Sequence, residues 1–160
     1  MSAVTLEISL LEAANLTDLM VQFEDLLGED AASDPAIARL VPDAYPDDPD
    51  AAREFRSLTQ DDLLGRRLDD VRVVRHSLRH EGRQLAAREL DRAQAEDVLV
   101  IPLDAGTSGA WLRTLAALRL VMAERLGIID DEGYDDSDPR FGVYEWLGYR
   151  LEGVVQALAR

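Results

Sequence analysis

The stretch from Gly109 to Leu126 constrains the fold of this chain most, because as a helix it is apolar around most of its circumference. At about 100° per residue, its polar side chains fall mainly on one flank. A helix of this kind needs cover on several sides, so we expect it to be the buried centre of the domain. Arg119 alone interrupts the apolar arc.

Two short segments have the composition of strands. Residues 4–9 alternate apolar and polar side chains, which is typical of a half-buried strand. Residues 98–103 read VLVIPL, and Pro102 marks this second segment as an edge strand or a strand end. Because each segment leads into a helix, we expect the two to pair as a small ribbon.

Cap residues divide the rest of the chain into helices. Ser9 followed by Glu12 predicts a capping box and a helix to Gly28, which should adopt the left-handed conformation at the C-terminal end. Aspartate followed by proline marks three further helix starts, at residues 34–35, 48–49 and 138–139. Thr59 with Asp62 predicts a fresh helix start.

Glycines predict where the later helices end, and the remaining segments are loops. Gly82 should interrupt the helix before an alanine-rich piece near residues 85–95, and Gly127 should cap the central helix. Residues 42–50 should form a stiff loop with Tyr45 against the domain, and residues 130–138 an acidic loop. We therefore expect one mainly α domain over residues 1–160, with five or six helices packed around a central buried helix and a small two-stranded β ribbon.

The chain is strongly acidic, with a formal net charge of −15 at pH 7, and all its basic residues are arginine. This charge repels nucleic acids and anionic membranes at long range, and it suits a partner with a basic surface or simply solubility. We expect no membrane span, no signal peptide and a cytoplasmic location. The sequence contains no cysteine, which excludes disulfides and thiol chemistry in this chain.

One face is locally positive despite the overall charge. The arginine-rich helix expected over residues 66–83 carries Arg72, Arg75, Arg79 and Arg83. Such a face can bind a phosphate backbone, stay solvated, or pair with acidic residues of the same chain. His76 and His80 have metal-ligand spacing, but the neighbouring arginines favour an exposed pair, so we expect no metal.

Residue patterns give no catalytic constellation. The turn DAGTSGA precedes the central helix but lacks the Walker lysine and the dinucleotide fingerprint, so we interpret it as a plain turn. The acidic loop lacks the ladder of an EF-hand. We therefore expect no catalytic residues, no cofactor and a protein that is not an enzyme.

Two sets of side chains stand out as structural or partner-binding candidates. Arg119 should form a structural ion pair, or else meet a ligand or an interface; its carboxylate candidates are Asp61, Asp62, Glu145 and Glu152.

The core face predicted for the last helix consists of Val143, Tyr144, Leu147, Leu151, Val154, Val155 and Leu158. A separate stripe comprises Trp146, Tyr149, Gly153 and Ala157. This stripe should receive the first helix of the same domain or form a dimer seam.

Three sequence blocks together carry a family resemblance. The first block is ARLVPDAYPDDPDAAREFRSLTQDDL at residues 38–63, the second WLRTLAALRLVMAERLGI at residues 111–128, and the third VYEWLGYRLEGVVQAL at residues 143–158. These blocks resemble the actinobacterial AosR family, whose members are labelled oxidative-stress transcriptional regulators. The resemblance spans most of the chain. Residues 80–97 and the DAGTSG glycines are less typical.

The resemblance implies a cytoplasmic regulator that acts by protein–protein contact with the transcription apparatus, with a sigma factor as the partner. A second copy of the chain is a further candidate partner. Because cysteine is absent, the sensing of oxidants would fall to a partner or to Met20 and Met122. The alternatives are direct DNA binding through the arginine-rich helix and an uncharacterised helical interaction module.

Overall fold

A computed structural model of the chain describes residues 4–28, 34–41, 47–128 and 141–159, with only the backbone at Ser57. In chain order the elements are β1 (Val4–Ser9), α1 (Leu10–Gly28), α2 (Pro35–Ala38), α3 (Pro49–Ser77), the 3₁₀ helix η2 (Ala87–Glu89), α4 (Arg92–Glu96), β2 (Val98–Leu103), α5 (Ala105–Leu126) and α6 (Gly142–Leu158). The predicted class is confirmed: the fold is mainly helical with a small two-stranded antiparallel sheet.

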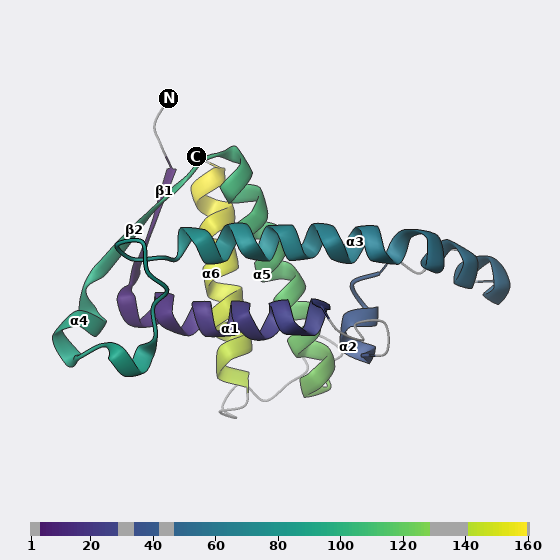
Figure 1. Cartoon of the computed structure of the whole chain (residues 1–160), viewed down its shortest axis with the longest axis horizontal. Coiled ribbons are helices and arrows are strands. Elements are labelled where there is room, and N and C mark those ends of the chain that lie inside the picture. Colours follow the sequence, from purple (N-terminus) through teal and green to yellow (C-terminus); the bar gives the residue numbers. More distant parts are fainter. Residues whose placement is uncertain (1–3, 29–33, 42–46, 129–140, 160) are drawn as a thin grey trace.

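The long helices form two crossed layers (Figure 1). α1 and α3 lie side by side in one layer, and α5 and α6 lie side by side behind them. α3 and α2 both pack on α5. The ribbon and α4 lie at one end of the molecule, and the N-terminal part of α3 extends past the other helices at the opposite end (Figure 1).

α5 is the buried centre that the sequence predicts. Trp111 and Leu115 are fully buried, and Met122 is partly buried at the rim of the core. The Trp111 Nε1–H donates to Ser77 Oγ over 3.0 Å, and Ser77 in turn donates to the Val74 carbonyl. This chain of hydrogen bonds fixes α5 against the C-terminal end of α3.

The caps of α5 lie partly where we expected. Gly127 has a φ of 72°, the left-handed conformation predicted for it. The helix begins at Ala105, about one turn before the predicted start at Gly109. The reason is Asp104, whose carboxylate accepts a hydrogen bond from the Thr107 N–H over 2.7 Å and so caps the helix. That hydrogen bond also holds the pKa of Asp104 below its ordinary value.

The predicted pairing of the two strands is confirmed. β1 and β2 are antiparallel in a continuous register that sets Val4 opposite Leu103 and Ser9 opposite Val98. Ile101 and Leu103 point into the core, whereas Val98 and Val100 on the other face are exposed. The ribbon therefore covers one end of the helical layers with one face and presents the other outward.

Two predicted helix ends are wrong. α3 is continuous through Thr59, whose hydroxyl donates to the Phe55 carbonyl one turn earlier instead of capping a new helix. Gly28 belongs to α1 and does not have the positive φ expected of it. The predicted position of Tyr45 and the predicted acidic loop lie outside the described residues.

The chain turns sharply after α3. Glu81 and Gly82 both have a positive φ, which confirms the predicted interruption near Gly82. The predicted arginine-rich helix over residues 66–83 is too long, because α3 ends at Ser77. His80 and Arg83 exchange two backbone hydrogen bonds in the turn that follows. The alanine-rich piece forms only η2 and α4.

The core face predicted for α6 is narrower than expected. Tyr144 and Leu147 are buried, but Val143, Val155 and Leu158 are exposed. The cause is the position of α6, which packs mainly on α5 and leaves the side chains on its far side exposed. No helix in the described part of the chain is both long and apolar enough to cross a bilayer.

Candidate functional site

A groove runs between α1 and α6. Its volume is about 450 Å³, and three apolar side chains line it: Leu19 from α1, and Val143 and Trp146 from α6. The remaining lining residues are Glu12, Asn15, Asp18 and Gly142. An apolar surface bordered by polar groups is typical of the places where protein partners dock.

Hydrogen bonds to Glu12 hold Trp146 and Arg150 at this groove. The Trp146 Nε1–H donates to Glu12 Oε2 over 3.3 Å, and the largely buried Arg150 donates to the same oxygen. The Glu12 backbone N–H donates to Ser9 Oγ, which is one of the two hydrogen bonds of the predicted capping box. The Glu12 carboxylate binds Trp146 and Arg150 and so joins the first turn of α1 to α6.

The predicted stripe on α6 therefore divides in two. Trp146 contacts α1 within this chain, as the intramolecular interpretation expected. Tyr149 is 70% exposed, with the Arg150 guanidinium 5.5 Å from its ring centroid. Gly153 is exposed as well. The binding of a partner by Tyr149 and Gly153 stays a prediction.

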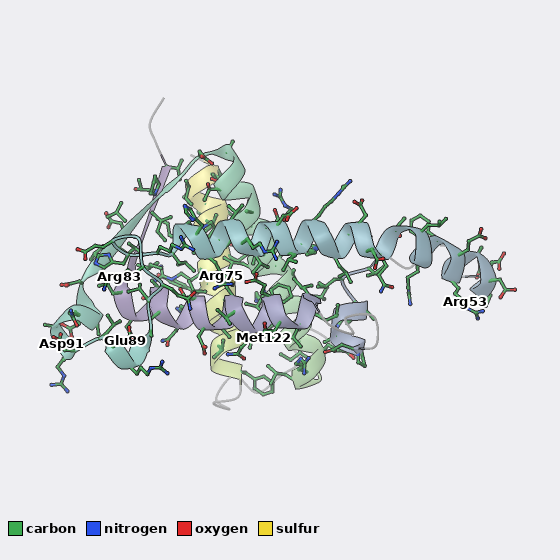
Figure 2. All side chains as sticks on the ribbon, viewed as in Figure 1. Arg53, Arg75, Arg83, Glu89, Asp91 and Met122 are labelled. Carbon is green, nitrogen blue, oxygen red and sulfur yellow. The ribbon has the colours of Figure 1, made fainter. Side chains whose placement is uncertain are left out.

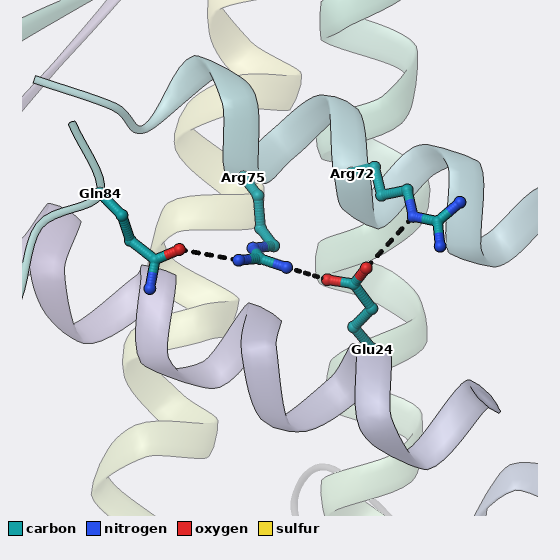
Figure 3. A network of polar contacts seen from close by, with 4 residues as sticks. All are labelled: Glu24, Arg72, Arg75 and Gln84. Atoms are coloured by element: carbon teal, nitrogen blue, oxygen red, sulfur yellow. Dashed lines mark hydrogen bonds and ion pairs between the residues drawn. The ribbon is translucent and has the colours of Figure 1, made fainter. Parts of the chain in front are cut away.

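The arginine face of α3 has an acidic partner on α1 (Figure 3). Glu24 accepts hydrogen bonds from Arg75 and from Arg72 Nε, the latter over 3.1 Å. The other side of the Arg75 guanidinium donates to Gln84 Oε1 over 2.7 Å. These groups, with His76 and Arg79, line a hollow of about 350 Å³.

The electrostatics of this cluster follow from its geometry. Burial raises the pKa of Glu24, but the hydrogen bonds and positive charges of Arg75 and Arg72 outweigh burial and lower it below 4.5. Glu24 is therefore ionised at neutral pH and offsets part of the local positive charge. Arg83 lies apart from Arg75, in the turn beyond the end of α3 (Figure 2). The four arginines thus do not form one continuous helical stripe.

Arg119 lies against α6. Its Nε donates to the Tyr144 carbonyl over 3.3 Å, and its guanidinium stacks 4.1 Å above the centroid of the Tyr144 ring. Gly148 makes this approach feasible, because a Cβ there would lie 2.9 Å from Arg119 Cζ. These contacts tie α5 to α6, and the ion pair predicted for Arg119 stays a prediction.

Alanine at Gly148 and at Gly153 should affect stability differently. Both glycines lie inside α6, where alanine gains about 0.5–1 kcal/mol over glycine. A Cβ at Gly153 meets nothing within 4 Å, so Gly153→Ala should raise the free energy of unfolding. Gly148→Ala pushes Arg119 off Tyr144 and should be about 1 kcal/mol less stable than Gly153→Ala. Urea denaturation measures both, and equal gains would contradict the close approach at Gly148.

The sequence analysis missed the long-range contacts of three acidic residues that join these helices, although it named Glu12 as a capping residue. Glu12 and Glu24 join α1 to α6 and α3, and Asp70 on α3 binds Arg113 on α5 through two hydrogen bonds of 2.9 and 3.0 Å. The contact with Asp70 raises the pKa of Arg113. No local pattern could have identified these pairs, because each joins segments far apart in the sequence.

Metal ligands do not converge in the part of the chain that the structure describes, where no group of three or more histidine or carboxylate side chains could hold an ion. His80 Nε2 lies 3.9 Å from the Glu81 carboxylate, and His76 borders the arginine hollow. The described surfaces include an apolar groove, a partly neutralised arginine cluster and an exposed ribbon face.

Comparison with known proteins identifies one family. The family model described as "Domain of unknown function (DUF2017)" matches residues 1–158. No curated protein and no solved structure matches the chain.

Proposed function

The chain belongs to the DUF2017 family, a family of unknown function, and we propose its role from its sequence blocks and its surfaces. We propose a regulator without catalytic activity that acts in the response to oxidative stress by protein–protein contact with the transcription apparatus. A sigma factor is the proposed partner. The resemblance to the AosR family supports a role in the response to oxidative stress. The groove between α1 and α6 supports action by protein–protein contact.

The groove is the observation that carries this proposal. It places Val143 and Trp146 beside each other on α6 at a surface large enough to receive side chains of a partner. Aromatic and aliphatic groups with a polar border commonly anchor protein interfaces. The net charge of −15 favours a partner with a basic surface, because opposite charges accelerate encounter. The same negative charge repels competing acidic proteins.

Sensing of an oxidant would then take place outside this chain. The chain has no cysteine, Met20 is fully buried in the core, and Met122 is partly buried at its rim. Oxidation of a buried methionine is slow and disrupts packing, so it makes a poor specific switch. We therefore propose that the partner carries the redox chemistry and that this chain contributes the contact.

Val143→Lys tests whether the partner binds at the groove or elsewhere on the surface. The variant puts a charge into the apolar groove, and we expect it to weaken binding to purified RNA polymerase or sigma subunits at least about tenfold. Val155→Lys is the matched control, because Val155 on the same helix is 44% exposed against 41% for Val143 and does not line the groove. Affinity-tagged protein and quantitative co-purification give the measurement. Absence of any polymerase or sigma subunit with the unsubstituted chain would overturn the proposal.

Direct DNA binding is the alternative function, and it has less structural support. Glu24 already engages Arg72 and Arg75, two of the four arginines proposed to contact phosphates. Charge reversal of Arg75 and Arg79 to glutamate in a gel-shift assay tests this alternative. A salt-sensitive shift that the reversal abolishes would favour DNA binding over the protein contact.

A further inference from the structure

The outer edge of β2 is open to a further strand. The sheet has only two strands in the described residues, so β2 has β1 on one side and no described strand on the other. The backbone groups on that second side can pair with an incoming extended chain. Which groups they are follows from the register.

The hydrogen-bonded pairs of the ladder can be assigned from two observations. In an antiparallel pair, hydrogen-bonded and non-hydrogen-bonded residue pairs alternate. The Leu10 N–H donates to the Asp97 carbonyl over 2.8 Å, one position beyond the strands in the same register. Leu99, Ile101 and Leu103 therefore bond to β1. Pro102, opposite Thr5, agrees with this assignment because it has no N–H to donate.

Val98 and Val100 consequently point their N–H groups away from β1. With the carbonyls of Val98, Val100 and Pro102 they form a row of donors and acceptors along the outer edge. No backbone hydrogen bond of the described residues outside the ladder involves Val98 or Val100. Their side chains are also exposed, Val98 to 60% and Val100 to 53%. Pro102 protects one position of this edge because it has no N–H to donate, but the uncharged, exposed Val98 and Val100 leave the rest of the edge open to strand addition.

The charges around this edge indicate what could cover it. Glu7 lies directly across the ladder from Val100, and Glu96 and Asp104 lie just beyond the two ends of β2; all three are exposed. A second copy paired antiparallel about Val100 would bring Glu96 against Asp104 of that copy. Such like charges, on two chains of charge −15 each, disfavour self-association.

We infer that the outer edge of β2 binds an extended segment of a protein partner, in which alternate β-branched side chains lie beside Val98 and Val100 and basic residues flank them. The inference rests on the proposed function in one respect only, that the partner is a protein. Main-chain hydrogen bonds supply affinity in strand addition, and the alternate side chains supply specificity. The groove between α1 and α6 is a separate surface.

Amide hydrogen exchange of the free chain over residues 1–160 is the first test. Val98 and Val100 should exchange at least about tenfold faster than Leu99 and Ile101, because only the latter pair are bonded to β1. This alternation along one strand is specific to an open edge. Equal protection of all four amides would mean that the edge is already covered and would overturn the inference.

A probe peptide provides the second test. We choose acetyl-Arg-Thr-Val-Thr-Val-Thr-Arg-amide, which sets its valines and terminal arginines on one face. At saturation it should slow exchange of the Val98 and Val100 amides and leave Leu99 and Ile101 unchanged. The same peptide with glutamate in place of both arginines should bind at least about tenfold more weakly. Equal binding of the two peptides, or protection elsewhere in the chain, would contradict the charge argument.

Substitutions separate the backbone contribution from the side chain. Val100→Lys, which can pair with Glu7 across the ladder, should weaken the peptide at least about tenfold by repulsion. Val155→Lys is the matched control on α6 and should bind normally. Val100→Thr retains the backbone groups and should stay within about threefold of the unsubstituted chain. Circular dichroism confirms folding of each variant, and loss of binding in the control would overturn the assignment.

Light scattering tests whether a second copy of the chain, and not another protein, covers the edge of β2. A dimer that Val100→Lys converts into a monomer would show that a second copy covers the edge and would overturn the inference. The two proposals also fail separately. Peptide binding at the edge without capture of any polymerase or sigma subunit would overturn the proposed function alone, whereas capture without protection of Val98 and Val100 would overturn the edge alone.

Discussion

Trp111→Ala should lower the free energy of unfolding by about 3–5 kcal/mol, which is the usual cost of truncating a buried tryptophan. Trp111 is the largest fully buried side chain, and the cavity left behind would lie between α5 and α3. The substitution also removes the donor to Ser77 Oγ. For a domain of this size the loss corresponds to a fall in Tm of roughly 10 °C.

Two further variants make this prediction specific. Trp111→Phe keeps most of the buried ring and removes the hydrogen bond to Ser77, so it should cost only about 1 kcal/mol. Tyr149→Ala truncates an aromatic side chain that is 70% exposed and should change stability by less than about 0.5 kcal/mol. Urea denaturation of the three variants gives the values. A cost below about 1 kcal/mol for Trp111→Ala would mean that α5 is not the centre of the core.

The elements that the sequence predicts correctly are those whose determinants lie within one turn of chain. Asp48 followed by Pro49 caps α3, and Asp34 followed by Pro35 caps α2, because an aspartate side chain reaches N–H groups two or three residues ahead. Gly127 ends α5 because glycine adopts the left-handed conformation without steric cost. The apolar periodicity of α5 likewise needs no partner to be recognised.

The errors arise where one residue can satisfy two structures. Thr59 can cap a new helix or return its hydroxyl to the carbonyl one turn earlier, and both patterns look alike in the sequence. The packing of α3 on α1 and α5 decides for the continuous helix. Gly28 similarly fits either a left-handed cap or the last turn of α1.

The candidate surfaces were predictable as residue types but not as contacts. Trp146 was recognised as part of a contact stripe, yet its partner Glu12 lies 134 residues away in the sequence. Glu24 pairs with Arg75 across 51 residues, and nothing local distinguishes it among the 32 acidic residues of the chain. The crossing of the two helical layers decides which of these side chains meet, and no single segment of the sequence specifies that crossing.

Glu24→Gln should lower the free energy of unfolding at neutral pH by about 1–2 kcal/mol, because it removes the negative charge that two arginines share (Figure 3). Exposure of Arg72 keeps the effect at the lower end of the range for charged hydrogen bonds. Glu124→Gln is the matched control, since Glu124 and Arg39 form an ion pair in which both side chains are about 40% exposed. That pair should contribute less than about 1 kcal/mol.

The dependence of this difference on pH identifies the carboxylate as its cause. The folded-state pKa of Glu24 lies below 4.5, so the ionised group favours the native state in full above pH 4.5. That contribution is lost as the pH falls through the folded-state pKa, because the native state must then bind a proton. The gap in unfolding free energy between the unsubstituted chain and Glu24→Gln should therefore be constant from pH 7 down to about 5 and shrink below 4.5. Urea denaturation across this range measures the gap, and a gap that widens toward acid would contradict the assigned contact between α1 and α3.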